Sequence, residues 1–254
     1  MSDEILYDVR DGIAWLTINR PESRNALNKS ARDAFGEAAR TFADDPDQLV
    51  LVITGTGDKA FCAGADLKEM ADSGMRIPPK DILVYFNRSL VTHKPIIAAV
   101  NGLAYAGGFQ LAQMVDLVVA ADHATFAITE ARVGRGSPWA APLPWIIGPR
   151  VALELLATAQ PITAQRAYEI GFVNRVVPAD QLLAETEKMA RAIADNAPLS
   201  VRAAKELVYA SASMGWHDGL DEGDRIYEKV YLSEDGQEGP RAFKEKRRPV
   251  WQGQ

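Results

Sequence analysis

The chain of 254 residues contains a single cysteine, Cys62. One cysteine excludes an internal disulfide framework and a cysteine-rich zinc site, and it is typical of a protein from a reducing compartment. An excess of basic charge is also absent, because 28 basic and 34 acidic residues give a formal net charge of −6. This acidic balance argues against a protein that binds phosphate backbones, so we expect no nucleic-acid partner.

Export signals and membrane spans are also missing from the sequence. The first ten residues, MSDEILYDVR, are acidic and lack the apolar stretch of a secretory signal. The most apolar region, residues 95–121, carries the polar side chains of Asn101, Gln110, Gln113 and Asp116. These side chains and the many glycines favour a buried strand, turn and helix over a membrane span. We therefore expect a cytoplasmic protein with no membrane partner.

Several common catalytic signatures are absent. No GxxxxGK[ST], HExxH or GxSxG sequence occurs, and Gly55-Thr-Gly57 lacks the third glycine of a dinucleotide fingerprint. The histidines, His93, His123 and His217, are scattered, and their neighbours do not suggest a catalytic triad. We interpret all three as ordinary histidines, and we expect neither a metal site nor a redox cofactor.

The chain does contain an alternation of strand and helix patterns. Strands are predicted at residues 13–18, 49–53, 96–100 and 115–119, which are rich in β-branched residues. The run at 49–53 is apolar without alternation, as expected for a strand that is covered on both faces. Together with the helical segments between them, these strands predict a mixed α/β fold.

Helices are predicted from apolar stripes at helical spacing. The first follows the capping-box spacing of Ser30 to Asp33 and stops at residues 44–46, and a second is expected around residues 81–91. Another begins at Gly107. From about residue 151 the chain becomes helical, with one apolar face formed by Leu182, Leu183, Thr186, Met189, Ala190 and Ile193 and another by Val201, Ala204 and Val208.

Two strand ends carry small residues just before a predicted helix, at residues 61–67 and 101–110. Small residues let a ligand approach the backbone, and the free N–H groups of a first helical turn suit a developing oxyanion. Such glycines also serve in simple tight turns. From the residues alone, both interpretations stay open.

Several longer segments resemble the enoyl-CoA hydratase/isomerase (crotonase) family, and they occur nearly throughout the chain in the family's order. The resemblance implies an α/β fold in which residues 1–195 form a spiral of ββα units with the acyl-CoA site. It further implies that residues 196–254 form a helical region through which the chain assembles as a homotrimer or a dimer of trimers. The segments are RPESRNAL (20–27), GTGDKAFCAGADLKEM (55–70), KPIIAAVNGLAYAGGFQLA (94–112), FAITEARVG (126–134), AYEIGFVNRVVP (167–178) and FKEKRRPVW (243–251).

The resemblance also implies roles for individual residues. The backbone N–H groups of Ala65 and Gly107 match the oxyanion hole that holds the thioester carbonyl of an acyl-CoA. Coenzyme A is then part of the substrate, and no separate cofactor is implied. The residues that match the family's coenzyme A contacts are Arg24, Ala26, Ala63, Asp66, Leu67 and Lys68.

The acid and base positions depart from the family's hydratase pattern. Hydratases carry two glutamates, whereas this chain has Gln110 at the first position and Glu130 at the second. An amide cannot exchange a proton near neutral pH. One carboxylate is enough for a 1,3 proton shift, so the sequence slightly favours an enoyl-CoA isomerase. Two alternatives remain: an enoyl-CoA hydratase acting on an unusual acyl group, and a CoA-thioester-binding protein with weak or no catalysis.

A second departure follows Glu130, where residues 134–145 are shorter and bulkier than the family's glycine-rich stretch. Trp139 either walls off the acyl end of the site or packs in a hydrophobic lid, and both interpretations stay open. Tyr85, Phe86 and Tyr105 are further candidates for pocket walls.

Overall fold

The computed structural model describes residues 3–66, 69, 74, 76–80 and 82–253. Within these residues the chain forms a six-stranded sheet in the order β1-β2-β3-β5-β7-β10 and a four-stranded sheet in the order β4-β6-β8-β9. The larger sheet consists of β1 (Ile5–Arg10), β2 (Ile13–Ile18), β3 (Val50–Gly55), β5 (Ile96–Val100), β7 (Leu117–Ala121) and β10 (Arg175–Val177). The smaller sheet consists of β4 (Ala60–Cys62), β6 (Leu103–Tyr105), β8 (Thr125–Ala127) and β9 (Ile162–Thr163).

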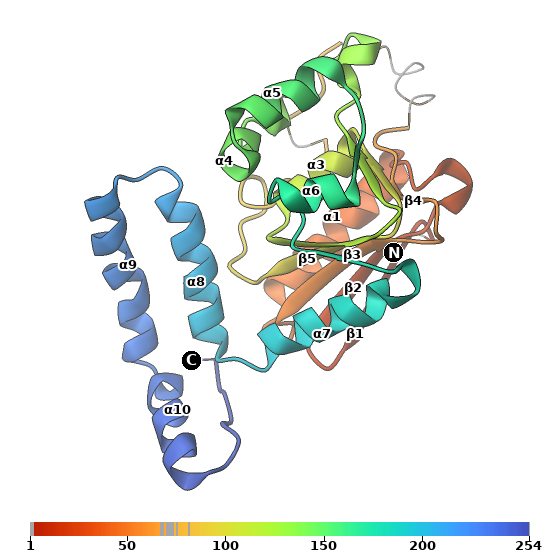
Figure 1. The fold of residues 1–254 in the computed structure, drawn as a ribbon. Helices are drawn as coiled ribbons and strands as arrows, with labels where there is room; N and C mark the ends of the chain where they lie inside the picture. The colour runs from red at the N-terminus through yellow and green to blue at the C-terminus, as the bar shows by residue number, and fades with distance from the viewer. Residues whose placement is uncertain (1–2, 67–68, 70–73, 75, 81, 254) are drawn as a thin grey trace.

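The helices cover the sheets and form a separate arm at the C-terminus (Figure 1). Figure 1 shows α7 on one side of the larger sheet and α1 and α3 on the other. The helices of the body are η1 (Pro21–Ser23), α1 (Lys29–Asp44), α3 (Gly107–Met114), η2 (Glu130–Val133), η3 (Pro138–Ala140), α4 (Leu143–Ile147), α5 (Pro149–Thr158), α6 (Ala164–Glu169), η4 (Ala179–Gln181) and α7 (Leu182–Ala194). The C-terminal arm consists of α8 (Pro198–Ser211), α9 (Trp216–Tyr231) and α10 (Glu234–Glu245).

The predicted strands are confirmed, with the bounds of β3 and β7 shifted by one or two residues. Strands β2 and β5 have the predicted bounds, and every residue of β3 is buried, as its apolar run predicts. Strand β7 begins two residues later than expected. Asp116 lies between α3 and β7, and its side chain accepts a hydrogen bond from the N–H of Ile96. Strand β6 was not predicted at all. It follows the Asn101-Gly102 turn directly and pairs with β4 and β8.

Helix α1 is confirmed, but it begins with a different cap. The side chain of Asn28, not that of Ser30, accepts a hydrogen bond from the backbone N–H of Ala31 at 2.8 Å. An asparagine outside the first turn satisfies a donor that the helix itself cannot. The helix ends at Asp44, as predicted.

The predicted helix around residues 81–91 is wrong over its described residues, 82–91, which form bends and a tight turn. The hydroxyl of Ser89 accepts a hydrogen bond from the N–H of Tyr85 at 2.8 Å, and Asn87 has a left-handed backbone with φ of 65°. Serine and asparagine compete with the helical backbone in this way. The residues with helical spacing therefore pack as a turn.

The apolar faces of the C-terminal helices are only partly as predicted. Leu182, Thr186, Met189 and Ala190 of α7 are buried, but Leu183 is exposed. On α8 the fully covered residues are Ala203 and Lys205, and Ala203 packs with Ile226 and Val230 of α9 in a small cluster of its own. The predicted stripe of Val201, Ala204 and Val208 instead lines an open cavity.

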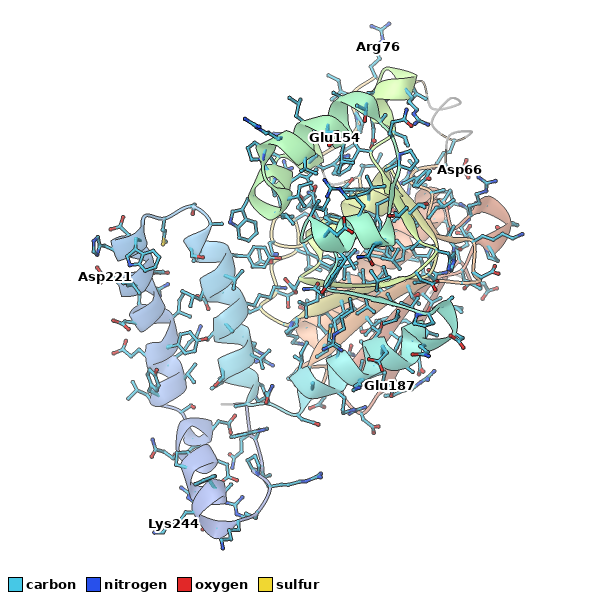
Figure 2. All side chains as sticks on the ribbon, viewed as in Figure 1. Asp66, Arg76, Glu154, Glu187, Asp221 and Lys244 are labelled. Atoms are coloured by element: carbon cyan, nitrogen blue, oxygen red, sulfur yellow. The ribbon has the colours of Figure 1, made fainter. Side chains whose placement is uncertain are left out.

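The C-terminal arm stands apart from the body, and side chains project from both sides of it (Figure 2). Trp216 of α9 and Phe243 of α10 are 82% and 87% exposed. A helix buries such residues when it belongs to a packed core. Among the described residues, no helix is both long enough and apolar enough to cross a membrane.

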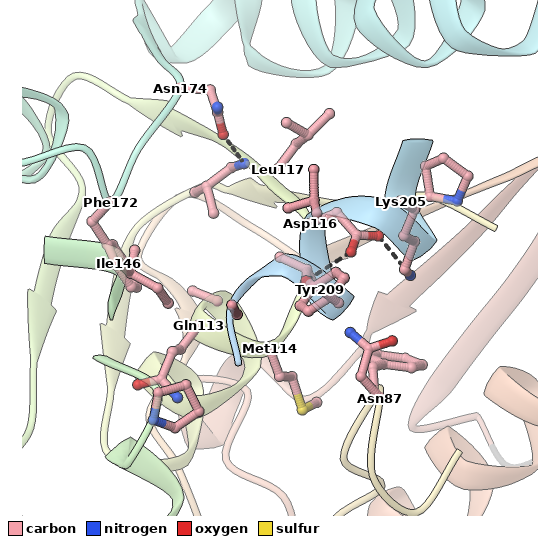
Figure 3. A pocket seen from close by; sticks show the side chains of 18 of the residues that line it. Asn87, Gln113, Met114, Asp116, Leu117, Ile146, Phe172, Asn174, Lys205 and Tyr209 are labelled. Carbon is pink, nitrogen blue, oxygen red and sulfur yellow. Dashed lines mark hydrogen bonds and ion pairs between the residues drawn. The ribbon is translucent and has the colours of Figure 1, made fainter. Parts of the chain in front are cut away.

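One buried ion pair ties the arm to the body (Figure 3). The ammonium of Lys205 on α8 lies 2.8 Å from the carboxylate of Asp116 and donates to the carbonyl oxygen of Lys94 at 2.9 Å. Oδ1 of Asp116 accepts from the hydroxyl of Tyr209 at 2.9 Å. Oδ2, which faces Lys205, also accepts from the N–H of Ile96 at 2.7 Å. These bonds join α8 to the starts of β5 and β7.

The same groups stand in the wall of a cavity of about 940 Å³ between α8 and the body. Its remaining wall is mostly apolar and includes Trp145, Ile146 and Phe172. Trp145 is exposed, and its ring centroid lies 6.2 Å from that of Tyr209. The cavity thus leaves apolar surface of both the arm and the body uncovered in a single chain.

Replacing Lys205 by methionine is expected to destabilise the protein strongly. Asp116 would keep its charge in a buried place without its cation, a loss that typically costs about 3–5 kcal/mol. Lys229→Met is the matched control, because the Lys229 to Glu206 pair at 2.7 Å is half-exposed on the same arm and exposed pairs contribute at most about 1 kcal/mol. Urea unfolding at one protein concentration measures the free energy of unfolding of both variants. Equal small losses would contradict the anchoring role of Lys205.

Candidate active site

The smaller sheet brings three chain segments to one edge. Strands β4, β6 and β8 are parallel neighbours, with Cys62 opposite Ala104 and Tyr105 opposite Ala127. Their carboxyl ends therefore lie side by side. The segments that leave these ends are residues 63–66, 106–110 and 128–130, which contain Ala65, Gly107, Gln110 and Glu130.

Two of these segments touch through their backbones. The Cα of Gly64 lies so close to the next segment that an added methyl group would stand 3.0 Å from the amide nitrogen of Gly107. A methyl group added to Gly107 would likewise lie 3.6 Å from the amide nitrogen of Ala65. Gly64 has φ of 101°, a conformation open to glycine, and Ala106 has the strained value of 51°.

The amides of Ala65 and Gly107 are free to bind a ligand. The neighbours of Ala65 carry the hydrogen bonds of its bridge to Leu27, from Leu27 N–H to Gly64 and from Asp66 N–H to Leu27. Gly107 is the first residue of α3, where N–H groups have no partner within the helix. Within the described part of the chain, neither amide has an acceptor. Two donors in adjacent segments suit one oxyanion.

Helix α3 packs onto β4 with no side chain between them. A methyl group on Gly108 would lie 1.9 Å from the carbonyl oxygen of Cys62, which no side-chain movement can relieve. Cys62 itself is buried, and burial raises the pKa of its thiol to about 12. The cysteine is therefore a packing residue beneath the site and not a nucleophile.

The predicted coenzyme A contacts come together along a second backbone contact. The bridge between Leu27 and Ala65, together with a bond of 3.1 Å from the N–H of Ala63 to the carbonyl of Arg24, sets residues 24–27 beside residues 63–66. This places Arg24, Ala26, Ala63 and Asp66 in one region, with Arg24 exposed and Ala26 buried. Leu67 and Lys68 lie outside the described residues.

Asn25 holds that loop, and the sequence analysis did not identify it. Its side chain is fully buried, donates to the carbonyls of Ala60 and Thr56 at 2.7 and 3.0 Å, and accepts from the N–H of Arg20 at 2.9 Å. Arg20 also forms ion pairs with Glu4 at 3.0 Å and Asp66 at 3.5 Å. An asparagine followed by two apolar residues, Ala26 and Leu27, in a loop after a strand, was the signal available in the sequence.

Glu130 opens the short helix η2 at the same sheet edge and is partly covered. Burial raises the pKa of its carboxyl group, and hydrogen bonds from the backbone N–H groups of Glu130 and Thr129 and from the side chains of Trp139 and Ser137 oppose that rise. One carboxyl oxygen, Oε2, is buried without a hydrogen-bond partner among the described residues. Such a group is suited to exchanging a proton.

Aromatic side chains cluster around Phe109. The ring of Trp139 lies 6.0 Å from that of Phe109, which stacks on Phe172 at 4.6 Å and meets Phe126 edge-on at 6.5 Å. Trp139 is partly buried against the main core. Both interpretations of the sequence analysis, a wall of the acyl site and packing in a hydrophobic lid, stay predictions.

The other aromatic candidates lie in different places. The hydroxyl of Tyr85 donates to the carbonyl oxygen of Trp139 at 3.0 Å, so Tyr85 lies beside the cluster around Phe109. Phe86 is buried against Phe35 at 6.4 Å, in the core. Tyr105 is half-buried, and its hydroxyl accepts from Thr125 at 3.2 Å.

Comparisons with known proteins agree over the whole chain. The family model for enoyl-CoA hydratase/isomerase matches residues 8–254. A carnitinyl-CoA dehydratase from Salmonella arizonae is 38% identical over 263 residues, covering 100% of both chains. A probable enoyl-CoA hydratase/isomerase from Mycobacterium abscessus has a TM-score of 0.89 at 39% identity, and an enoyl-CoA hydratase from Mycobacterium tuberculosis H37Rv has 0.91 at 34%, each with 100% coverage of both chains. The structural matches confirm the predicted crotonase-like fold with its C-terminal helices.

Replacing Glu130 by glutamine is expected to stabilise the protein at neutral pH. A raised pKa in the folded state means that the folded protein binds the proton more tightly than the unfolded chain. The free energy of unfolding therefore falls as the pH rises from the pKa of the unfolded chain to the pKa of the folded protein. The melting temperature of Glu130→Gln should therefore exceed that of the wild type at pH 7, and the difference should vanish at about pH 4.

Glu154→Gln is the control, because it removes an exposed carboxylate from α5. It should change the melting temperature little at either pH. A Glu130→Gln protein that melts below the wild type at pH 7 would contradict the view that the buried carboxylate is destabilising.

Proposed function

The chain belongs to the enoyl-CoA hydratase/isomerase family, and from this premise we propose that it is an acyl-CoA enzyme that works with one acid/base residue, Glu130. In the proposal the backbone N–H groups of Ala65 and Gly107 hold the thioester oxygen. Enoyl-CoA isomerisation is the net reaction that this set of groups serves best. The observation that carries the proposal is that the amide of Gln110 and the partly buried carboxyl group of Glu130 lie on segments that leave the same sheet edge as the backbone amides of Ala65 and Gly107.

The proposed reaction begins with Glu130 as a carboxylate. It takes a proton from the α carbon of a 3-enoyl thioester, and the electron pair of that C–H bond moves into the conjugated system, so that negative charge collects on the thioester oxygen. Hydrogen bonds from Ala65 and Gly107 stabilise that charge more strongly than they stabilise the neutral carbonyl. Glu130 then returns the proton to the γ carbon, which leaves a 2-enoyl thioester and restores the carboxylate.

The environment of Glu130 favours this shuttle. Burial raises the pKa of the carboxyl group, which makes its carboxylate a stronger base than an exposed glutamate. A pKa closer to the working pH also allows the same group to give the proton back. Gln110 at the other position can hold a water or a substrate oxygen through its amide, but it supplies no second proton carrier.

Coenzyme A is proposed to bind along residues 24–27 and 63–66. Arg24 is the exposed cation of this region, suited to the phosphates, and the small side chains of Ala26 and Ala63 leave the backbone accessible to the pantetheine chain. Asp66 closes the region. Leu67 and Lys68 remain part of the proposal by resemblance.

Dehydration of a 3-hydroxyacyl-CoA, or its reverse, is the second candidate. The name of the Salmonella relatives, carnitinyl-CoA dehydratase, favours it. In this scheme Glu130 removes the α proton and passes it to the departing hydroxyl group, while the Gln110 amide holds that oxygen. A third candidate, a CoA-thioester binder without catalysis, is distinguished by the loss of proton exchange.

The Glu130→Gln variant is expected to lose turnover by at least about 10²-fold, because the amide keeps the shape of the side chain but carries no exchangeable acid proton. Solvent-deuterium incorporation into bound acyl-CoA should stop as well. Calorimetric affinity for the acyl-CoA should stay close to the wild-type value. Mass spectrometry of 3-enoyl and 3-hydroxyacyl thioesters incubated with the wild type identifies the net reaction. Undiminished exchange in the variant would falsify the single-carboxylate scheme.

Assembly through the C-terminal arm is also proposed, as a homotrimer or a dimer of trimers. The support is the apolar surface that one chain leaves uncovered on the arm, in residues such as Trp216, Leu220, Tyr231 and Leu232. Exposed patches of this kind mark contact surfaces. Light scattering at micromolar concentration is expected to give three or six times the chain mass of 27.7 kDa. A monodisperse monomer would contradict this assembly.

A further inference from the structure

We propose that Arg20 and Arg32 are positioning residues for the binding of coenzyme A. Each guanidinium group contacts a backbone carbonyl oxygen of residues 24–27 and a carboxylate that follows Ala65 in the chain, so the two arginines hold these segments together. The inference rests on the proposed binding of coenzyme A along these segments. The hydrogen bonds and ion pairs that carry it are contacts of the folded chain itself.

Arg20 follows strand β2 and reaches both segments. Its guanidinium group donates to the carbonyl oxygen of Ala26 and lies 3.5 Å from the carboxylate of Asp66. Its Nε lies 3.0 Å from the carboxylate of Glu4, just before β1. The Arg20 side chain is 12% exposed. Because partly buried charges are screened much less by salt than exposed ones, these contacts persist at physiological ionic strength.

Arg32, in the first turn of α1, makes the same pair of contacts one residue further along the chain. Its Nη1 donates to the carbonyl oxygen of Leu27 at 2.9 Å and to Oε2 of Glu69 at 3.0 Å, and its Nη2 reaches Oε1 of Glu69 at 3.5 Å. Oε1 of Glu69 also accepts from the backbone N–H of Lys29 at 3.0 Å. Lys29 is the first residue of α1, where free N–H groups favour a carboxylate. Arg32 and Glu69 therefore tie both segments to the start of α1.

The two segments also bond to each other directly. The N–H of Leu27 donates to the carbonyl oxygen of Gly64 at 2.8 Å, and the N–H of Asp66 donates to the carbonyl oxygen of Leu27 at 3.2 Å. The carbonyl oxygen of Leu27 thus accepts from both Asp66 and Arg32. A planar guanidinium group with five donors can serve a carbonyl and a carboxylate at the same time. Arg32 therefore reinforces the backbone pairing at the residue where it is centred.

The loop of residues 24–27 depends on such support because its backbone is strained. Arg24 and Asn25 have left-handed φ values of 53° and 55°. Residues other than glycine adopt this conformation rarely, and it persists where the surrounding structure enforces it. Arg20 also binds this loop through its own backbone, since its carbonyl oxygen accepts from the N–H of Asn25 at 2.8 Å and its N–H donates to the Asn25 side chain at 2.9 Å. Loss of either guanidinium group is therefore expected to loosen the loop.

The charges around the two arginines indicate that they act on the protein and not on a phosphate. The two guanidinium groups face three carboxylates, those of Glu4, Asp66 and Glu69. Their positive charge is therefore matched within the protein, whereas Arg24 is the exposed cation of the region. The arginines raise the affinity for coenzyme A by holding both segments in one conformation before the ligand arrives, because binding then includes less cost for ordering the loop.

The first test needs no ligand. In Arg20→Met and in Arg32→Met, the amide hydrogens of Leu27, Ala63 and Asp66 should exchange with solvent at least about tenfold faster than in the wild type. These amides bond the two segments together, and a hydrogen bond to a charged group contributes at least that factor to local stability. Exchange of the amides of α9, in the C-terminal arm, should not change.

Lys29→Met is the matched control for this test. Lys29 lies on the same turn of α1 as Arg32, and its exposed ammonium pairs with Asp33 at 2.5 Å. The substitution removes a cation and leaves the backbone bond from Lys29 to Glu69 in place. Amide exchange should therefore stay at the wild-type rate.

The second test measures affinity for coenzyme A by calorimetry. The dissociation constant should rise about tenfold in Arg20→Met and Arg32→Met, the factor that corresponds to ordering one or two further groups on binding. It should not change in Lys29→Met. Kinetics then compare a 3-enoyl-CoA with the same acyl group on N-acetylcysteamine, which lacks the nucleotide. The ratio of the two kcat/KM values should fall about tenfold through the KM of the CoA thioester, whereas a general loss of folded protein would lower both values equally.

Unchanged amide exchange in folded Arg20→Met and Arg32→Met proteins would overturn the proposal. Faster exchange with unchanged affinity for coenzyme A and an unchanged kinetic ratio would overturn the positioning role. If Arg20→Met does not fold, Glu69→Gln takes its place beside Arg32→Met, because Glu69 is the more exposed partner and its substitution keeps the shape of the side chain.

Failure of the proposed function gives a different result. A wild type that does not bind coenzyme A would refute the proposed binding region and the positioning role with it, even if the amides of Arg32→Met exchange faster. Undiminished turnover of Glu130→Gln, together with a raised dissociation constant in Arg32→Met, would refute the proton-transfer scheme and support the positioning role of the arginines.

Discussion

The first turn of α3 lies directly on the end of β4, and the rest of the site depends on this contact. Gly108 meets the carbonyl of Cys62, and Gly107 meets Gly64, without a side chain between the two backbones. This spacing places the amides of Ala65 and Gly107, the proposed oxyanion donors, in adjacent segments. Because Gln110 and Gln113 lie on the same helix, the contact also sets their positions. The contact forms because Gly107 and Gly108 have no Cβ atom.

In its proposed role, Glu130 trades stability for chemistry. Its carboxyl group is partly buried and one oxygen has no partner among the described residues, which disfavours the ionised form in the folded protein. The donors around it limit the cost without removing it. A fully satisfied carboxylate would be a weaker base, and a neutral acid would be none. The bulky segment after Glu130 contains Trp139, whose carbonyl oxygen accepts hydrogen bonds from Tyr85 and Gln113.

The C-terminal arm is attached by polar contacts and is apolar on its free surface. Lys205 and Tyr209 of α8 meet at Asp116, so the arm leaves the body at a defined angle. Beside this attachment the cavity and the exposed aromatic residues remain uncovered. A buried ion pair adds direction more than net stability. Contacts within the chain therefore set the orientation of the arm, while the apolar surface of the arm stays exposed to solvent in a single chain.

The sequence by itself determined the local features. The β-branched runs specify β2, β3 and β5, since strand propensity and burial act over a few residues, and the quoted segments identify the family and the positions of Glu130 and Gln110. Local reasoning failed at residues 82–91, where Ser89 binds the backbone of Tyr85 and Asn87 has a left-handed backbone. It also failed at the stripe of Val201, Ala204 and Val208, which faces a cavity. Only the tertiary structure decided which segments touch. The hydrogen bonds from Tyr85 and Gln113 to the carbonyl oxygen of Trp139 join residues up to 54 positions apart. Hydrogen bonds over such separations follow from strand register and helix packing, which no local pattern encodes.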